Sequence, residues 1–348
     1  MDYLLRQLLP HTSALVFLAI GIGVGTLLAG WIEYLTTEPP GSARTRWTRY
    51  NPLAGLTSPN RRWWLLVQLG TGLLFAAFVF CMLQWQCQKT PSVVPSEYWR
   101  QGRIVYQLIL LSLLVAATGT DFRDYVIPDA ITVTGIVIAI AGATYSGEVQ
   151  IVHIWVDWNN EEPLKGPYLP AWMDQHRHLH GLAWSAAGLI AGAGITWLVR
   201  VVSATMLGQE SLGFGDVTLM AMIGSFVGWQ PVILIFLLAP FCGLLVVMTA
   251  RLLTGRTFIP YGPFLSAATV VVLFGWRWLW TPMRYIFGHA PSLLLLGGSA
   301  FTALLVLLGL LRLYRAIPVT GRTQTETGEQ APEQSETDAP TAETDPHA

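Results

Sequence analysis

The sequence predicts an all-α polytopic membrane protein with about eight to nine transmembrane helices. Of the 348 residues, 53% are hydrophobic and only 12% are charged, whereas about 25% of the residues of a soluble domain are charged. The hydrophobic residues also gather in runs close to the roughly 20 residues that one membrane-spanning helix requires. Low charge and long apolar runs therefore indicate a chain embedded in the lipid bilayer.

The predicted spans follow one another along the chain. Residues 217–252 are too long for one span, so we expect them to divide at Trp229-Gln230-Pro231 into a short helix and a full one. The polar loop 146–180 lies between spans, and the tail 318–348 has a composition typical of disorder. The remaining spans are expected near residues 13–32, 63–83, 104–120, 130–145, 181–202, 263–281 and 292–313.

The basic residues favour one orientation. With the N-terminus outside, Lys and Arg are more frequent in the inside regions, chiefly because of the 33–62 loop. The formal net charge of −1 leaves no basic surface of the kind that binds nucleic acid. We therefore expect a multi-pass membrane protein whose inside face is cytoplasmic, with no nucleic-acid partner.

Two aspartates occur at span ends that this orientation places on the same face. Asp121 closes the predicted span at 104–120, and Asp216 opens the short span that begins at 217. Two neighbouring carboxyl groups cannot both ionise easily, so such a pair shares a proton. The ionised member can take a proton from water while the protonated member donates a hydrogen bond to a carbonyl oxygen. The pair is therefore a candidate for peptide-bond hydrolysis.

The glycines before Asp216 have a related interpretation. Gly213 and Gly215 lack Cβ, so backbone or substrate can approach closely and positive φ is allowed. An extended substrate strand could then lie beside Asp216. The alternatives are structural: Asp216 caps a helix N-terminus, and Asp121 is a solvated loop residue.

Neighbouring polar residues have simpler interpretations. We interpret Asp124 as solvated and Asp129 as a helix cap. The stretch "QHRHLHG" brings together three histidines, which could bind Zn²⁺, but a solvated outside loop is the favoured interpretation. Its histidines are His176, His178 and His180.

Three blocks in order carry a family resemblance. They are "DFRDYVIPDAIT" from Asp121, "GFGD" ending at Asp216, and "IPYGPFLSAA" at 259–268. In order and spacing they resemble the D-x-x-x-x-x-[LI]-P-[DN], G-x-G-D and P-[FY]-G-P-F-L blocks of the type IV prepilin leader peptidases. The matching segment covers roughly residues 104–280.

The resemblance implies an aspartic endopeptidase of the cytoplasmic (inner) membrane, with Asp121 and Asp216 as its catalytic pair. Such enzymes cut a short basic leader from prepilins or pseudopilins of type IV pilus and type II secretion systems. The cut is made at the cytoplasmic face, typically after a glycine, and no metal or organic cofactor is implied for it. The blocks also suggest supporting site residues, namely Gly213, Gly215, Pro128, Gly262 and Pro263.

The N-terminal part departs from the family pattern. Many bacterial members carry two zinc-binding C-x-x-C pairs there, but this chain has no cysteine from 33 to 62. Those members also methylate the new N-terminus with S-adenosylmethionine, an activity associated with this region. We therefore expect cleavage rather than methylation, with S-adenosylmethionine a cofactor only if methylation is retained. We interpret Cys81, Cys87 and Cys242 as small apolar residues, since they form no C-x-x-C pair.

These observations predict four regions. Residues 1–103 form an N-terminal membrane region with a cytoplasmic loop, and 104–281 form the peptidase core. Residues 282–317 provide a C-terminal transmembrane helix, and 318–348 are the acidic tail.

Two other classes of function fit part of the pattern. A proton-coupled transporter could use Asp121 and Asp216 as a relay, since intramembrane carboxylates often mark proton paths. Their position at one face rather than mid-span argues against it. A membrane scaffold would use both aspartates as helix caps only.

Overall fold

The computed structural model describes most of the membrane-embedded chain. The described residues are 2–36, 61–90, 93, 95–155, 157–162, 166–168, 173, 175–208, 212–254 and 260–316. The predicted acidic tail at 318–348 and most of the predicted loop at 33–62 lie outside them.

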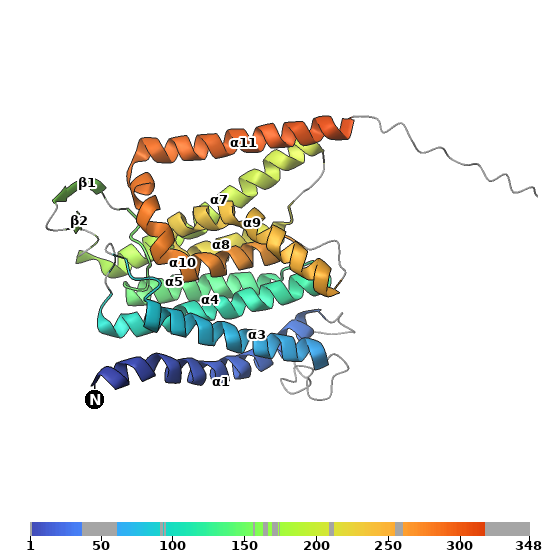
Figure 1. Cartoon of the computed structure of the whole chain (residues 1–348). Helices are drawn as coiled ribbons and strands as arrows, with labels where there is room; N and C mark the ends of the chain where they lie inside the picture. Colours follow the sequence, from blue (N-terminus) through green and yellow to red (C-terminus); the bar gives the residue numbers. More distant parts are fainter. Residues whose placement is uncertain are drawn as a thin grey trace, which may run out of the picture.

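The described chain is a bundle of long helices (Figure 1). Within the described residues, eight helices are long and apolar enough to cross a membrane, and α8 is a shorter apolar helix. An all-α polytopic membrane protein is therefore confirmed. The helices are α1 (Asp2–Thr36), α3 (Arg61–Phe80) with its π-helical extension η2 (Cys81–Trp85), α4 (Glu97–Asp124), α5 (Asp129–Ser146), α7 (Arg177–Leu207), α8 (Phe214–Val227), α9 (Trp229–Thr254), α10 (Gly262–Gly288) and α11 (Ala290–Ala316).

The loop predicted at 146–180 is more structured than expected. It contains a small antiparallel hairpin of β1 (Asp157–Glu162) and β2 (Gly166–Tyr168). Its last residues already belong to α7. The prediction of solvated histidines is wrong for His180, which is buried within α7 and accepts a hydrogen bond from the Ile154 N–H at 3.3 Å. His178 is exposed, so these two side chains lie in different environments.

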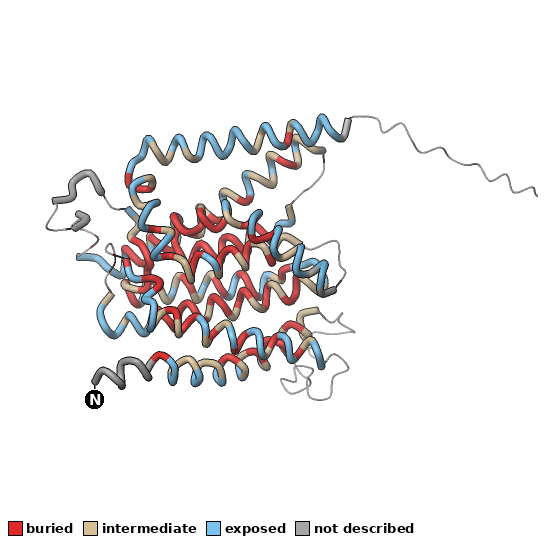
Figure 2. The backbone as a smooth tube through the Cα atoms, viewed as in Figure 1, coloured by how far each residue is buried: buried red, intermediate tan, exposed pale blue. Residues whose placement is uncertain are grey.

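The core forms around α4 and α8, while α11 lies at the edge of the bundle (Figure 2). In the most apolar stretch of α4, 72% of the residues are buried, whereas in that of α11 only 6% are buried. Leu294 and Leu295 of α11 are among its exposed apolar side chains. Such a helix suits contact with lipid, because its backbone groups are satisfied internally and its side chains are apolar.

Close packing of α7 against α8 fixes α8 in the core. A Cβ on Gly188 would collide with the carbonyl oxygen of Gly224, and a Cβ on Gly224 would collide with that of Gly188. Gly192, one turn along α7, packs in the same way against the carbonyl of Met220. Gly188 and Gly192 form a GxxxG pattern, which lets membrane helix backbones approach closely. Side chains at these positions would push α8 away from α7.

The predicted division of the long apolar run is confirmed, and the chain turns at Gly228. Gly228 has a φ of 86°, in the left-handed region that favours glycine. A side chain there would also collide with the indole of Trp184. The turn therefore depends on glycine for both conformation and space.

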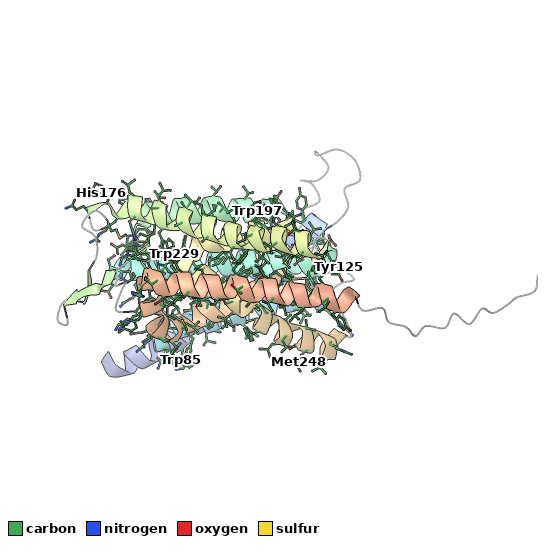
Figure 3. The ribbon with its side chains drawn as sticks, turned by 90° about the horizontal axis from the view of Figure 1, so that it is seen from above. Trp85, Tyr125, His176, Trp197, Trp229 and Met248 are labelled. Atoms are coloured by element: carbon green, nitrogen blue, oxygen red, sulfur yellow. The ribbon has the colours of Figure 1, made fainter. Side chains whose placement is uncertain are left out.

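The bundle has two distinct ends. Tyr125 and Met248 lie toward one end, whereas Trp85, His176 and Trp229 lie toward the other (Figure 3). Helix α4 finishes at the first of these ends, where α8 and α10 begin. We call it the aspartate end, because Asp121 lies in the last turn of α4 and Asp216 in the first turn of α8.

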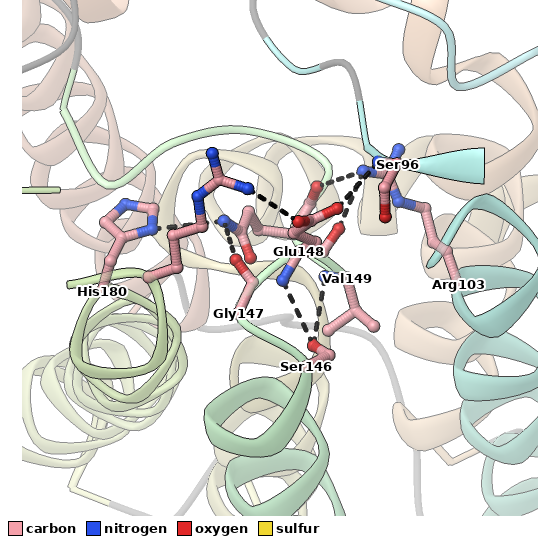
Figure 4. A network of polar contacts seen from close by, with 9 residues as sticks. Ser96, Arg103, Ser146, Gly147, Glu148, Val149 and His180 are labelled. Atoms are coloured by element: carbon pink, nitrogen blue, oxygen red, sulfur yellow. Dashed lines mark hydrogen bonds and ion pairs between the residues drawn. The ribbon is translucent and has the colours of Figure 1, made fainter. Parts of the chain in front are cut away.

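A polar network joins three helices at the opposite end (Figure 4). The Glu148 carboxylate accepts the Ser96 N–H at 2.7 Å and pairs with Arg177 at 2.9 Å. The buried Arg103 guanidinium donates to the backbone carbonyls of Glu148 and Gln150, at 3.2 and 2.7 Å. These contacts connect the start of α4 with the end of α5 and the start of α7.

Glu148→Gln tests this network through stability. Burial raises the Glu148 pKa, but the Ser96 N–H and the Arg177 charge outweigh burial and lower it overall. The stabilisation is therefore complete above the unfolded pKa of about 4.3 and is lost as pH falls through the lower folded pKa. In thermal unfolding at pH 7, we expect the substitution to cost about 0.5–2 kcal/mol.

The difference between Glu148→Gln and wild type should shrink as the pH falls below the unfolded pKa. Glu97→Gln is the matched control, since the Glu97–Arg100 pair is solvent-exposed and should contribute little. Equal effects of the two substitutions would contradict the role given to Glu148.

The α7–α8 contact gives a second test. Gly188→Val should lower the free energy of unfolding by about 2 kcal/mol or more, because a packed interface overfills. Gly194→Val is the control on the same helix, since a Cβ at Gly194 meets no atom within 4 Å. Thermal unfolding in detergent measures both, and a control as unstable as Gly188→Val would show that the α7–α8 contact is not responsible.

Candidate active site

Asp121 is buried in the last turn of α4. Only 4% of the surface of Asp121 is exposed, so the alternative of a solvated loop residue does not hold. The helix ends at Tyr125, whose φ of 57° is left-handed and whose N–H donates to the Asp121 carbonyl at 3.1 Å. The Asp121 carboxylate accepts the N–H of Gly262 at 3.1 Å. This bond connects the end of α4 to the start of α10.

Asp216 is buried in the first turn of α8, with 8% of its surface exposed. Gly213 is the N-cap, and Asp216 is the third helical residue rather than the cap itself. The Asp216 carboxylate accepts the Gly213 N–H at 3.2 Å, which is the side-chain half of a capping box. A capping role for Asp216 is therefore present, but it operates from inside the helix and leaves the carboxyl group buried.

The two carboxyl groups lie close enough to interact electrostatically. They belong to helices that are far apart in sequence and begin or end at the same end of the bundle. Each carboxylate accepts one backbone N–H, from Gly262 and Gly213 respectively. The arrangement is thus a pair of buried acids, each oriented by a backbone donor.

Ile127 fills the space between the loops that carry these donors. A Cβ on Gly215 would lie 3.2 Å from the Ile127 Cβ. A Cβ on Gly262 would lie 3.1 Å from the Ile127 Cδ1 and would also collide with the Asp121 carboxylate. Pro128 follows as the N-cap of α5, with extended backbone at φ −67° and ψ 138°. Our sequence reasoning missed Ile127, although it occupies the [LI] position of the first block.

Tyr261 is a second residue that sequence reasoning missed. It directly precedes Gly262, and burial together with the negative charge of Asp216 raises its pKa to about 12. Its ring packs edge-on against Phe264, with centroids 5.8 Å apart. The [FY] position of the third block was the available signal, but it did not indicate an electrostatic interaction with Asp216.

The two glycines before Asp216 provide space rather than unusual backbone. Gly213 has a φ of −70° and an extended ψ of 153°. The described glycines with positive φ are elsewhere, at Gly147, Gly208 and Gly228. The positive φ that glycine allows is therefore not used at Gly213 or Gly215, whereas the close approach is used at Gly215 against Ile127.

The remaining site predictions have clear locations. Pro263 is buried in the first turn of α10, directly after Gly262. Asp124 is exposed, in agreement with its solvated interpretation. Asp129 is exposed at the first position of α5, so its predicted capping role is wrong in detail: Pro128 occupies the cap. Within the described part of the chain, no three His, Cys, Asp or Glu side chains group as metal ligands do.

Comparison with known proteins supports one family. The type IV leader peptidase family matches residues 168–248, a segment that includes the G-x-G-D block and excludes Asp121 and Gly262. A Pseudomonas putida protein named prepilin leader peptidase/N-methyltransferase is 29% identical over 184 residues, which is 51% of this chain and 53% of that protein. An Escherichia coli O78:H11 protein named type 4 prepilin-like proteins leader peptide-processing enzyme is 27% identical over 210 residues, or 60% of each.

A prepilin leader peptidase/N-methyltransferase of Escherichia coli K12 is 33% identical over 94 residues, which is 26% of this chain and 42% of that protein. The matches thus cover from two-fifths to three-fifths of the length of these relatives. No solved structure matches this chain significantly. The family match and the curated relatives agree with the three sequence blocks, since all of them point to the type IV leader peptidase family.

Proposed function

We propose that this protein is a membrane aspartic endopeptidase that removes the leader peptide of type IV prepilin-like proteins. The observation that carries the proposal is the buried, interacting carboxyl pair of Asp121 and Asp216 at one end of the bundle. The match of residues 168–248 to the type IV leader peptidase family supports the same activity. In this proposal the aspartate end faces the cytoplasm, in the inner membrane.

The pair would act as a shared acid and base. The ionised aspartate takes a proton from a water molecule, whose oxygen attacks the scissile carbonyl carbon. The protonated aspartate hydrogen-bonds the carbonyl oxygen as negative charge develops on it. The tetrahedral intermediate then collapses, the C–N bond breaks, and the departing amine takes a proton from the pair. The Gly262 and Gly213 N–H groups hold the two carboxyl groups in orientation throughout.

The substrates in this proposal are prepilins or pseudopilins presented at the membrane edge. The extended backbone at Gly213 lies beside Asp216, where a substrate strand would be cut. Gly215, Pro128, Gly262 and Pro263 would shape the site rather than react. Cleavage by this route uses water and needs no cofactor. Methylation, which appears in the names of relatives, would need S-adenosylmethionine and is not part of the proposal.

A proton-coupled transporter is the weaker alternative. Both aspartates lie at one end of the bundle, and the sequences of α7, α9, α10 and α11 contain no acidic residue that could extend a relay. No observation in the structure favours transport.

Substitution of either aspartate tests the proposal. With a co-expressed prepilin, Asp121→Asn and Asp216→Asn should each lower cleavage by about 100-fold or more, because neither acid–base role survives. Asp124→Asn is the matched control, since Asp124 is exposed three residues from Asp121. Full processing by either pair variant would contradict the assignment.

Gly262→Ala tests the positioning of Asp121. The added methyl group would collide with the Asp121 carboxylate, so cleavage should fall at least about tenfold, as misplacement of a catalytic group commonly costs. Gly297→Ala is the control, because a Cβ at Gly297 meets no atom within 4 Å. Prepilin processing and thermal unfolding are measured together. Wild-type cleavage by folded Gly262→Ala would contradict this role.

A further inference from the structure

Two cysteines meet where the α3 helix ends. Cys81 opens the π-helical extension η2, and Cys87 follows the left-handed Gln86. The Cys87 N–H donates to the Cys81 carbonyl at 3.4 Å, and the two thiols lie close enough to interact with each other. Both residues are buried, with 2% and 0% of their surface exposed. The structure therefore brings two thiols together within one turn.

The backbone between the two cysteines has an unusual conformation. Gln86 has a φ of 48°, and Tyr125 is the other non-glycine residue with positive φ in the described part of the chain. Such backbone persists only where its surroundings impose it. Single π-helical turns such as η2 are rare and frequently occur at functional sites. A local constraint that draws Cys87 back toward Cys81 would account for both features.

The same turn packs against α10. The Cys87 carbonyl accepts the Arg277 N–H at 2.8 Å, and the Cys81 thiol donates to the Phe274 carbonyl at 3.8 Å. A thiol is a weak donor, so its oxidation would lose little stabilisation at this contact. The backbone bond from Arg277 does not involve sulfur. A cross-link between the cysteines is therefore compatible with the position of the turn beside α10.

The cysteine pair lies at the end of the bundle opposite the aspartates. Trp85, two residues before Cys87, lies toward that end, whereas Tyr125 lies toward the aspartate end (Figure 3). With the aspartate end facing the cytoplasm, as in the function proposed above, the pair faces the extracytoplasmic side. Disulfides form and persist in oxidising extracytoplasmic compartments, whereas the cytosol keeps thiols reduced.

We propose that Cys81 and Cys87 form an intramolecular disulfide that closes the last turn of α3. The proposal rests on the orientation given with the proposed function, but not on cleavage itself. The bond fixes the start of the link from α3 to α4, the helix that carries Asp121.

The oxidant is an external disulfide of the extracytoplasmic side. One cysteine thiolate attacks it to form a mixed disulfide, and the second thiolate then displaces the external sulfur. The two cysteine thiols lose two electrons and two protons, and the external disulfide is reduced to two thiols. This exchange precedes the packing of α10 over the turn, because both cysteines are buried in the folded protein.

Counting free thiols in the full chain tests the bond. Cells that express the protein are quenched with acid, and the denatured protein reacts with a maleimide–polyethylene glycol reagent that adds one mass step per free thiol. The chain has three cysteines, so wild type should show one step before reduction and three after it. Three steps without reduction would overturn the proposal, and so would a reducible dimer in place of the intramolecular bond.

Cysteine variants identify the two partners. Cys81→Ser and Cys87→Ser should each show two steps with or without reductant, because the remaining partner is left as a free thiol. Cys242→Ser is the matched control, since Cys242 belongs to α9, and it should show no step before reduction and two after it. Two steps in unreduced Cys242→Ser would overturn the assignment, even if the other two variants fail to accumulate.

Prepilin processing by the same wild-type protein separates this proposal from the peptidase function. A protein that cleaves prepilin but has three free thiols overturns the disulfide and leaves the peptidase function standing. A protein that contains the disulfide but cleaves no prepilin supports the disulfide and contradicts the peptidase function.

Discussion

The hydrogen bond from the Gly262 N–H to the Asp121 carboxylate organises this structure. It joins the last turn of α4 to the first turn of α10, across 141 residues of sequence. It can form only because Gly262 has no side chain, since a Cβ there would occupy the position of the carboxylate. The third sequence block thereby meets the first, and the Ile127 side chain packs against Gly262 and Gly215. Without this bond, Asp121 would be a buried acid with no defined orientation.

Burying two acids side by side is unfavourable, so the surrounding helices must hold them in place. A backbone donor satisfies each carboxylate, and the Asp216 donor comes from the cap of its own helix. Helix α8 is held in position by its close packing against α7, because Gly188 and Gly192 bring α7 into direct contact with the α8 backbone. The same glycine packing that stabilises the core therefore sets the position of the second acid.

The polar groups at the two ends of the bundle differ in their charge pattern. At the opposite end, Glu148, Arg103 and Arg177 connect helices and loop through complementary charges and carbonyl groups. At the aspartate end, two buried acids lie close enough to interact electrostatically. Complementary charges stabilise a fold, whereas neighbouring acids are a source of reactivity. The stabilising network and the candidate acid pair thus lie toward opposite ends of α4, near Arg103 and at Asp121.

The membrane spans and the two candidate aspartates could be predicted from the sequence. Run lengths identified the spans and their division near Trp229, because hydrophobicity alone determines which segments enter a bilayer. The ordered blocks resemble the family to which the comparisons also point, and they drew attention to both aspartates. The prediction of solvated histidines was wrong for His180, because packing of the 146–180 segment against α7 buries this side chain. No periodicity in the sequence indicates that packing.

The sequence by itself determined the composition of the membrane helices and the residues of the candidate site. Only the tertiary structure decided that both carboxyl groups are buried, that the Gly262 N–H donates to Asp121, and that Ile127 and Tyr261 lie at the candidate site. The physical reason is that these features arise from contacts between segments remote in sequence. Local patterns specify helices and turns, whereas burial and electrostatic coupling depend on which helices pack against one another.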